Sequence, residues 1–108
     1  MPVTVRPAVP ADRAAIAAMA QEVVEAGEMF VFESVDDVLE YWLDPRGELF
    51  VAEVDGALLG TYVVKPNQKG RGAHVANAGY MTSADARGRG VGRAMGEHSL
   101  AFARERGY

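Results

Sequence analysis

The chain has no cysteine and only two histidines among its 108 residues. Without cysteine there can be no disulfide, no thiolate metal site and no cysteine nucleophile. Two histidines are too few to indicate a zinc site, so we expect no metal centre. The length suits one domain with a single hydrophobic core, which we expect to cover residues 1–108.

Positive charge and long apolar runs are also scarce. Eleven Lys and Arg residues against fifteen Asp and Glu residues give a net charge of −4. Because nucleic-acid-binding domains usually carry a basic excess, we expect no nucleic-acid partner. No apolar run approaches the length that spans a membrane, and the first residues lack the apolar stretch of a signal peptide. We therefore expect no membrane association and a cytoplasmic protein.

The spacing of apolar residues predicts strands and helices in the order β-α-α-β-β-β-α. Asp55 and Gly56 form a strong type I′ hairpin signal, which makes the strands on either side antiparallel. Three consecutive strands then form a meander, so the fold class is α+β with a mixed, mainly antiparallel sheet. The expected strands are 3–6, 49–54, 58–64 and 75–82, and the expected helices end near 27, near 43 and near 106, with a polar loop at 65–72.

Residues 87–93 read Arg-Gly-Arg-Gly-Val-Gly-Arg and stand between a strand that ends near Thr82 and a helix that begins at Val91. Glycines let backbone N–H groups approach an anion without a Cβ in the way. The start of a helix adds unpaired N–H groups and a partial positive charge, and arginines add bidentate donors. This arrangement predicts a phosphate-binding loop, and on an acidic chain it suits a small anionic ligand.

Two other phosphate motifs do not fit this loop. The dinucleotide pattern G-x-G-x-x-G fails because its sixth position is Arg93 when counted from Gly88 and Met95 when counted from Gly90. The Walker pattern fails because no Gly-Lys pair is followed by Ser or Thr. A tight turn with solvated arginines is the alternative without a ligand. Three glycines in five residues are costly unless a bare backbone is needed, which favours the phosphate loop.

The pattern that fits is Arg/Gln-x-x-Gly-x-Gly/Ala at residues 87–92. In this setting it resembles the acetyl-CoA pyrophosphate loop of the GCN5-related N-acetyltransferase (GNAT) superfamily. Residues 5–16, the hairpin at 51–60 and the last helix are similar to the matching parts of that fold, so the resemblance covers the whole chain. Residues 74–80 also resemble the fourth strand of a narrower group, which acetylates proline analogues such as azetidine-2-carboxylate.

The resemblance implies that an acceptor amine attacks the thioester of acetyl-CoA directly, which agrees with the absence of cysteine. The N–H groups of the loop would hold the pyrophosphate. The end of the fourth strand would pair through its backbone with the pantetheine arm, and one of its N–H groups would polarise the acetyl carbonyl. The implied cofactor-binding residues are Tyr80, Met81, Thr82, Arg87, Gly88, Arg89, Gly90, Val91, Gly92 and Arg93.

The general base is not identified by the resemblance. Many family members have a glutamate on the fourth strand, and the matching position here is Ala76. We expect Asn77 to orient the amine or a substrate carboxylate, the alternative being a plain strand amide. His74 would act as a base through water or be merely solvated. Glu28 and Glu33 flank a segment that borders the acceptor site in the family, and they either shape substrate choice or are solvated.

A complete family member continues after the helix that ends here near Tyr108. The C-terminal strand, helix and hairpin that follow form the other wall of the cofactor cleft and commonly carry the tyrosine that protonates the leaving thiolate. We therefore expect an incomplete GNAT domain whose fourth strand is an open edge, completed by the rest of a longer protein or by a second copy in a homodimer.

The sequence thus predicts an N-acetyltransferase that uses acetyl-CoA as co-substrate and a small amine or amino acid-like molecule as acceptor. The alternative is a non-catalytic module that binds acyl-CoA or dimerises, with its sheet completed by another chain. Thiol release in the presence of amines distinguishes the two.

Overall fold

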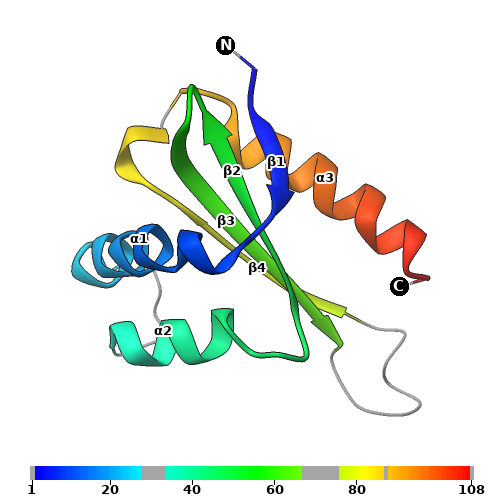
Figure 1. Ribbon diagram of the computed structural model, residues 1–108, viewed down its shortest axis with the longest axis horizontal. Coiled ribbons are helices and arrows are strands. Elements are labelled where there is room, and N and C mark those ends of the chain that lie inside the picture. The colour runs from blue at the N-terminus through cyan, green and yellow to red at the C-terminus, as the bar shows by residue number, and fades with distance from the viewer. Residues whose placement is uncertain (1, 28–33, 67–75, 87, 108) are drawn as a thin grey trace.

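The computed structural model describes residues 2–27, 34–66, 76–86 and 88–107. Over these residues a sheet lies between two helices on one face and a third helix on the other (Figure 1). The order confirms the predicted α+β class and the predicted succession of elements. The elements are β1 (Thr4–Pro7), α1 (Arg13–Glu25), α2 (Val35–Trp42), β2 (Glu48–Val54), β3 (Ala57–Pro66), β4 (Ala76–Thr82) and α3 (Val91–Glu105), with 3-10 turns at Pro10–Asp12 and Ala84–Ala86.

The four strands of the described sheet lie in the order β1-β2-β3-β4, and every neighbouring pair is antiparallel. The turn between β2 and β3 has positive φ at both central residues, 52° at Asp55 and 80° at Gly56, as the predicted type I′ hairpin requires. β4 occupies one edge of this sheet, so its outer side is paired with no described strand. No described helix is long and apolar enough to cross a membrane.

Alternating side chains of the sheet supply two apolar layers. Val51 and Val63 point toward α1 and α2, whereas Phe50 and Tyr62 point toward α3. The layer under α1 and α2 contains Ile16, Met19, Ala20, Val23, Val38, Trp42, Val51, Val63 and Met81. The layer under α3 contains Phe50, Ala52, Val54, Leu59, Tyr62, Val64, Ala86, Val91, Met95 and Phe102.

A glycine in β3 lets α3 approach the sheet closely at its N-terminal end. A Cβ placed on Gly60 would lie 2.6 Å from Cγ1 of Val91 and 3.0 Å from the Met95 side chain. A distance of 2.6 Å is shorter than a non-bonded carbon–carbon contact allows. Any residue larger than glycine at position 60 would therefore push the start of α3 away from β3. Gly60 therefore fixes where the loop before α3 lies relative to the end of β4.

Lys65 was expected at the start of a polar loop, and this expectation is wrong, because β3 continues to Pro66. The Lys65 residue is only 9% exposed. Its ammonium lies 3.4 Å from the centre of the Tyr41 ring and donates to the Tyr41 carbonyl and to Asp44 at 3.2 and 3.3 Å. These partners offset the cost of burying the charge and tie the end of α2 to β3.

Candidate functional site

The end of β4 presents free backbone groups along its outer edge. The Ser83 N–H donates to the Leu59 carbonyl at 2.9 Å, so Ser83 and Leu59 form a hydrogen-bonded pair. Along an antiparallel ladder, hydrogen-bonded and non-hydrogen-bonded pairs alternate. Met81, opposite Thr61, is therefore a hydrogen-bonded position, whereas the positions of Tyr80 and Thr82 are not. The N–H and C=O groups of Tyr80 and Thr82 consequently point away from β3, toward the open edge.

The side chains of these three residues lie on different faces of the sheet. Met81 is 2% exposed and packs in the layer under α1 and α2. Tyr80 is 43% exposed, and its hydroxyl forms a 2.6 Å hydrogen bond with Oγ of Ser99 in α3. Met81 thus anchors the strand in the core, while Tyr80 and Thr82 leave their backbone groups available to a ligand that lies along the edge.

The loop after β4 turns through two glycines in the left-handed region. Gly88 has a φ of 76° and Gly90 a φ of 73°, a conformation that residues with a Cβ adopt at a cost. Gly90 caps α3, and the first N–H to donate to its carbonyl is that of Ala94, at 3.0 Å. By helix geometry the N–H groups of residues 91–93 have no acceptor within the helix, and the partial positive charge of the helix lies there.

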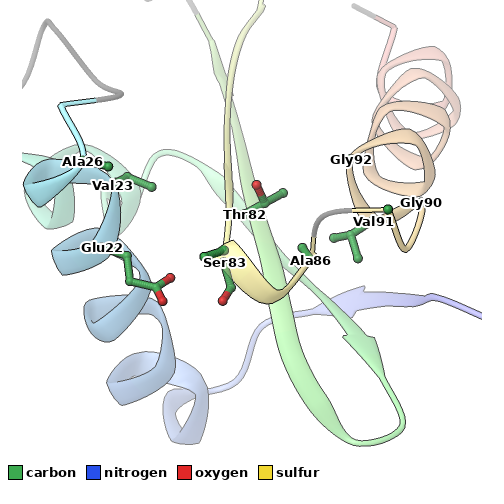
Figure 2. A pocket seen from close by; sticks show the side chains of 11 residues that line it. Glu22, Val23, Ala26, Thr82, Ser83, Ala86, Gly90, Val91 and Gly92 are labelled. Atoms are coloured by element: carbon green, nitrogen blue, oxygen red, sulfur yellow. The ribbon is translucent and has the colours of Figure 1, made fainter.

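A pocket of about 370 Å³ lies between α1 and this loop. In Figure 2 the C-terminal half of α1 forms one wall, the start of α3 forms the opposite wall, and Thr82 and Ser83 lie between them. The described lining residues are Glu22, Val23, Ala26, Thr82, Ser83, Ala84, Ala86, Gly88, Gly90, Val91 and Gly92. The end of β4 and the glycine loop thus open onto one cavity.

The three loop glycines fit a phosphate-bearing group. A Cβ built on Gly88, Gly90 or Gly92 would meet no protein atom within 4 Å, and all three residues line the pocket. Side chains there would meet open space instead of colliding with the fold. Gly92 has neither a positive φ nor a close neighbour, so neither backbone conformation nor packing accounts for it. Its place in the pocket lining is compatible with a ligand that approaches the backbone.

The side chains of Arg89 and Arg93 do not line the pocket, in contrast to the loop glycines. Arg89 is exposed, and its N–H donates to the Ala86 carbonyl at 3.1 Å. The Arg93 guanidinium pairs with Glu97 at 3.3 Å on the exposed surface of α3. The Arg93 backbone N–H still belongs to the open first turn of α3. In the described part of the loop, backbone groups and not guanidinium groups therefore form the wall of the pocket.

Several predicted site residues stay predictions. Asn77 lies in β4 opposite Lys65 in the strand register, and its place is described for the backbone alone. No described contact tests whether it orients a substrate. The residues that fall outside the described ranges are Glu28, Glu33, His74 and Arg87.

Two polar residues of the pocket, Glu22 and Ser83, belong to none of the motifs found in the sequence. Glu22 precedes Val23, which is buried in the layer under α1 and α2, so the helical period places it beside the buried stripe. Its position next to this buried stripe was the only sequence feature that indicated a place for Glu22 at the pocket. The 3-10 turn at Ala84–Ala86, which brings Ser83 to the pocket, had no distinct sequence signal.

His98 belongs to the packing of α3 and not to the pocket. Its Nδ1 lies 2.5 Å from the Tyr62 hydroxyl, and burial raises the pKa of that phenol. Phe50, Tyr62 and Tyr80 occupy facing positions on three neighbouring strands, with ring centres 4.8 and 5.6 Å apart. Through the His98–Tyr62 and Ser99–Tyr80 contacts, α3 is held against β3 and the edge strand β4.

Comparison with known proteins identifies the family. The model of the acetyltransferase (GNAT) family matches residues 16–108. The chain belongs to this family. The match includes the pocket, β4 and the glycine loop, so the GNAT resemblance seen in the sequence is confirmed.

Three relatives illustrate the likeness. The N-acetyltransferase aca1 of Schizosaccharomyces pombe is 36% identical over 66 residues, which cover 59% of this chain and 32% of that protein. A GCN5-related N-acetyltransferase from Kribbella flavida is 37% identical, with a TM-score of 0.87 over 98% of this chain and 67% of that one. A GNAT phosphinothricin acetyltransferase from Sinorhizobium meliloti, solved with acetyl-CoA, has the same fold at 22% identity, with a TM-score of 0.78 over 95% of this chain and 60% of that one. The chain thus spans about a third of the yeast protein.

Proposed function

We propose that this chain is the acetyl-CoA-binding part of a GNAT N-acetyltransferase that passes acetyl directly to the amine of a small, amino acid-like molecule. One observation carries the proposal: the glycine loop and the open end of β4 meet in the same pocket. The loop fits an anion, and the strand edge fits a chain of amides. Acetyl-CoA carries both, in its pyrophosphate and its pantetheine arm.

The pocket and the edge of β4 that leads into it each have a task in this proposal. The open N–H groups at the start of α3 hold the pyrophosphate, because the helix end is positive there. The Tyr80 carbonyl and the outward groups of Thr82 pair with the pantetheine amides as a further strand would. The Tyr80 N–H donates to the acetyl carbonyl, where negative charge develops as the amine attacks. Acetyl-CoA supplies the activated acetyl group as a thioester.

The acceptor proposal rests on the strand that precedes the loop. Residues 74–80 resemble the fourth strand of acetyltransferases for proline analogues, and Asn77 lies in that segment. The Schizosaccharomyces pombe relative bears the name N-acetyltransferase, which agrees with an amine acceptor. We therefore propose L-azetidine-2-carboxylate and related amino acids as the first acceptors to test.

Calorimetric titration with CoA and acetyl-CoA is the first test. We expect saturable one-site binding that weakens as the salt concentration rises, because the pocket recognises phosphate charge. Absence of binding to the folded chain would refute the proposed function. Thiol release is then measured with L-azetidine-2-carboxylate, a simple primary amine and an O-alkylhydroxylamine. Binding without thiol release from any of them would instead support the non-catalytic acyl-CoA-binding module.

A further inference from the structure

Tyr80, whose N–H is proposed to donate to the acetyl carbonyl, has no bond of its own in the β3–β4 ladder. Its two neighbours in β4 occupy hydrogen-bonded positions opposite β3, whereas its own N–H and C=O point toward the open edge. The direction of this N–H therefore depends also on the contacts that side chains make with the helices on either face. An oxyanion donor is effective only when it is aimed at the carbonyl oxygen.

A buried serine of α3 holds the Tyr80 side chain. Ser99 is 6% exposed, and its hydroxyl donates to the Gly96 carbonyl at 2.9 Å. Because a serine hydroxyl has one hydrogen, Tyr80 is the donor in the 2.6 Å bond between the two hydroxyls, and Ser99 is the acceptor. The Ser99 hydroxyl thus has a fixed orientation, and Tyr80, although exposed, is tied to the middle of α3.

The other face of β4 is in contact with α2 at the preceding residue. A Cβ built on Gly79 would lie 3.0 Å from Cη2 of Trp42 and 3.4 Å from Cε1 of Tyr41. Trp42 is buried, so its ring packs directly against the bare backbone of β4. The peptide that joins Gly79 to Tyr80 carries the proposed donor N–H. Trp42 prevents it from shifting toward α2, and the bond to Ser99 restrains its rotation about the strand axis.

A different part of α3 fixes the glycine loop. Val91 and Met95 pack where Gly60 leaves room on β3, at the N-terminal end of the helix. Ser99 lies about two turns further along. The proposed pyrophosphate site and the proposed acetyl donor are therefore positioned by separate contacts of the same helix, and loss of one contact need not disturb the other.

We propose that Ser99 is a positioning residue for the acetyl group: through the Tyr80 side chain it fixes the direction in which the Tyr80 N–H meets the thioester carbonyl. This inference rests on the proposed function, because it assumes that acetyl-CoA lies along the edge of β4. It adds a requirement that the glycine loop does not impose: Ser99 affects the acetyl group and leaves the binding of the rest of the cofactor unchanged.

The test compares CoA with acetyl-CoA, which differ in the acetyl group alone. Ser99→Ala and Tyr80→Phe each remove the hydrogen bond between the two hydroxyls. Tyr62→Phe is the matched control, because it removes a hydroxyl that bonds His98 of the same helix from the neighbouring strand. By calorimetry, the first two variants should weaken acetyl-CoA binding about two- to tenfold, as loss of one aligned hydrogen bond predicts, and leave CoA affinity unchanged. Tyr62→Phe should change neither affinity.

Infrared spectra of bound acetyl-CoA with an isotope-labelled carbonyl give a second readout, which needs no turnover. A hydrogen bond from Tyr80 should lower the carbonyl stretching frequency relative to free acetyl-CoA. Ser99→Ala and Tyr80→Phe should move the band back toward the free position. Ser99→Thr, which keeps the hydroxyl, should leave it lowered, as should Tyr62→Phe. Tyr80→Phe leaves the buried face of α3 intact, so it decides the question if Ser99→Ala does not fold.

The possible results separate the two proposals. If the unsubstituted chain binds neither CoA nor acetyl-CoA, the proposed function fails, and this inference fails with it. If both bind but the carbonyl band equals that of free acetyl-CoA, or does not respond to Ser99→Ala and Tyr80→Phe, the inference alone is overturned. Equal weakening of CoA and acetyl-CoA would also overturn it, because that is the result of a merely structural role.

Discussion

Single residues show which parts of the glycine loop serve the fold and which are left for a ligand. Gly88 and Gly90 have positive φ, so the turn into α3 requires them whether or not anything binds. Gly92 lies in the first turn of α3 with ordinary helical geometry and open space where a side chain would stand. Gly96, one turn further along α3, is equally open, so what distinguishes Gly92 is its place at the pocket, where a side chain would stand next to a bound ligand.

This difference leads to a prediction for Gly92 with a control on the same helix. Gly92→Val should weaken CoA binding about tenfold or more, because its side chain would occupy the pocket where phosphate is proposed to bind. Gly96→Val should leave CoA affinity unchanged, since Gly96 has equally open space but does not line the pocket. Both variants should keep or slightly raise the free energy of unfolding, measured by urea denaturation. Equal CoA affinities for the two variants would contradict the phosphate site.

At the level of elements, one arginine links the first strand to the start of α1 and to β2. Arg6 in β1 donates to both carboxylate oxygens of Asp12, at 2.8 and 2.9 Å, and pairs with Glu53 of β2. Asp12 also accepts from the Val9 N–H at 2.8 Å and is 8% exposed. Hydrogen bonds from Arg6 are the main cause of a lowered pKa at Asp12, against the opposing effect of burial. This link helps to position α1, which forms one wall of the pocket.

The lowered pKa of Asp12 gives a pH-dependent prediction. A carboxylate with a depressed folded-state pKa stabilises the fold above its unfolded pKa of about 4, and this contribution is lost as the pH falls through the folded value. Asp12→Asn should therefore cost about 1–3 kcal/mol at pH 7, because the partly buried Arg6 guanidinium loses its charged partner. The difference from the unsubstituted chain should shrink below about pH 4. Urea denaturation between pH 3 and 7 measures it, with the exposed Glu40→Gln as control. A difference independent of pH would contradict the role of the charge.

At the level of the whole molecule, β4 forms both an edge of the described sheet and one boundary of the pocket. The backbone groups that would bind pantetheine are those that a further strand would use. A second copy of the chain and CoA would therefore compete for the same edge. We therefore expect that self-association through β4 and the proposed cofactor binding would exclude each other at Tyr80 and Thr82.

Proline substitution tests this use of the edge. Thr82→Pro removes an outward N–H, which an edge strand tolerates, so the fold should persist while CoA binding weakens and self-association decreases. Met81→Pro removes an N–H that is bonded to β3 and should destabilise the whole chain. Light scattering with and without CoA, together with calorimetry, measures both effects. If Thr82→Pro bound CoA normally, the proposed backbone pairing would be wrong.

The regular parts of the fold follow closely from local sequence. Serine is a preferred helix cap, and the Ser34 hydroxyl caps α2 by accepting from the Asp37 N–H at 3.2 Å. The Asp55–Gly56 turn and the end of α1 near Gly27 are also confirmed, because each depends on residues close in sequence. The continuation of β3 through Lys65 was missed. Its burial depends on Tyr41 and Asp44, more than twenty residues away in the chain, which no local pattern reports.

The sequence by itself determined the α+β class, the order of the elements and the glycine loop at the start of α3. Periodicity, turn chemistry and the backbone freedom of glycine are local properties, so they can be read before the chain folds. Only the tertiary structure decided which backbone groups of β4 face outward, since that depends on the pairing with β3. It also decided that Glu22 of α1 lies across the pocket from Gly90 and Gly92, because the packing of α1 and α3 against the sheet brings them together.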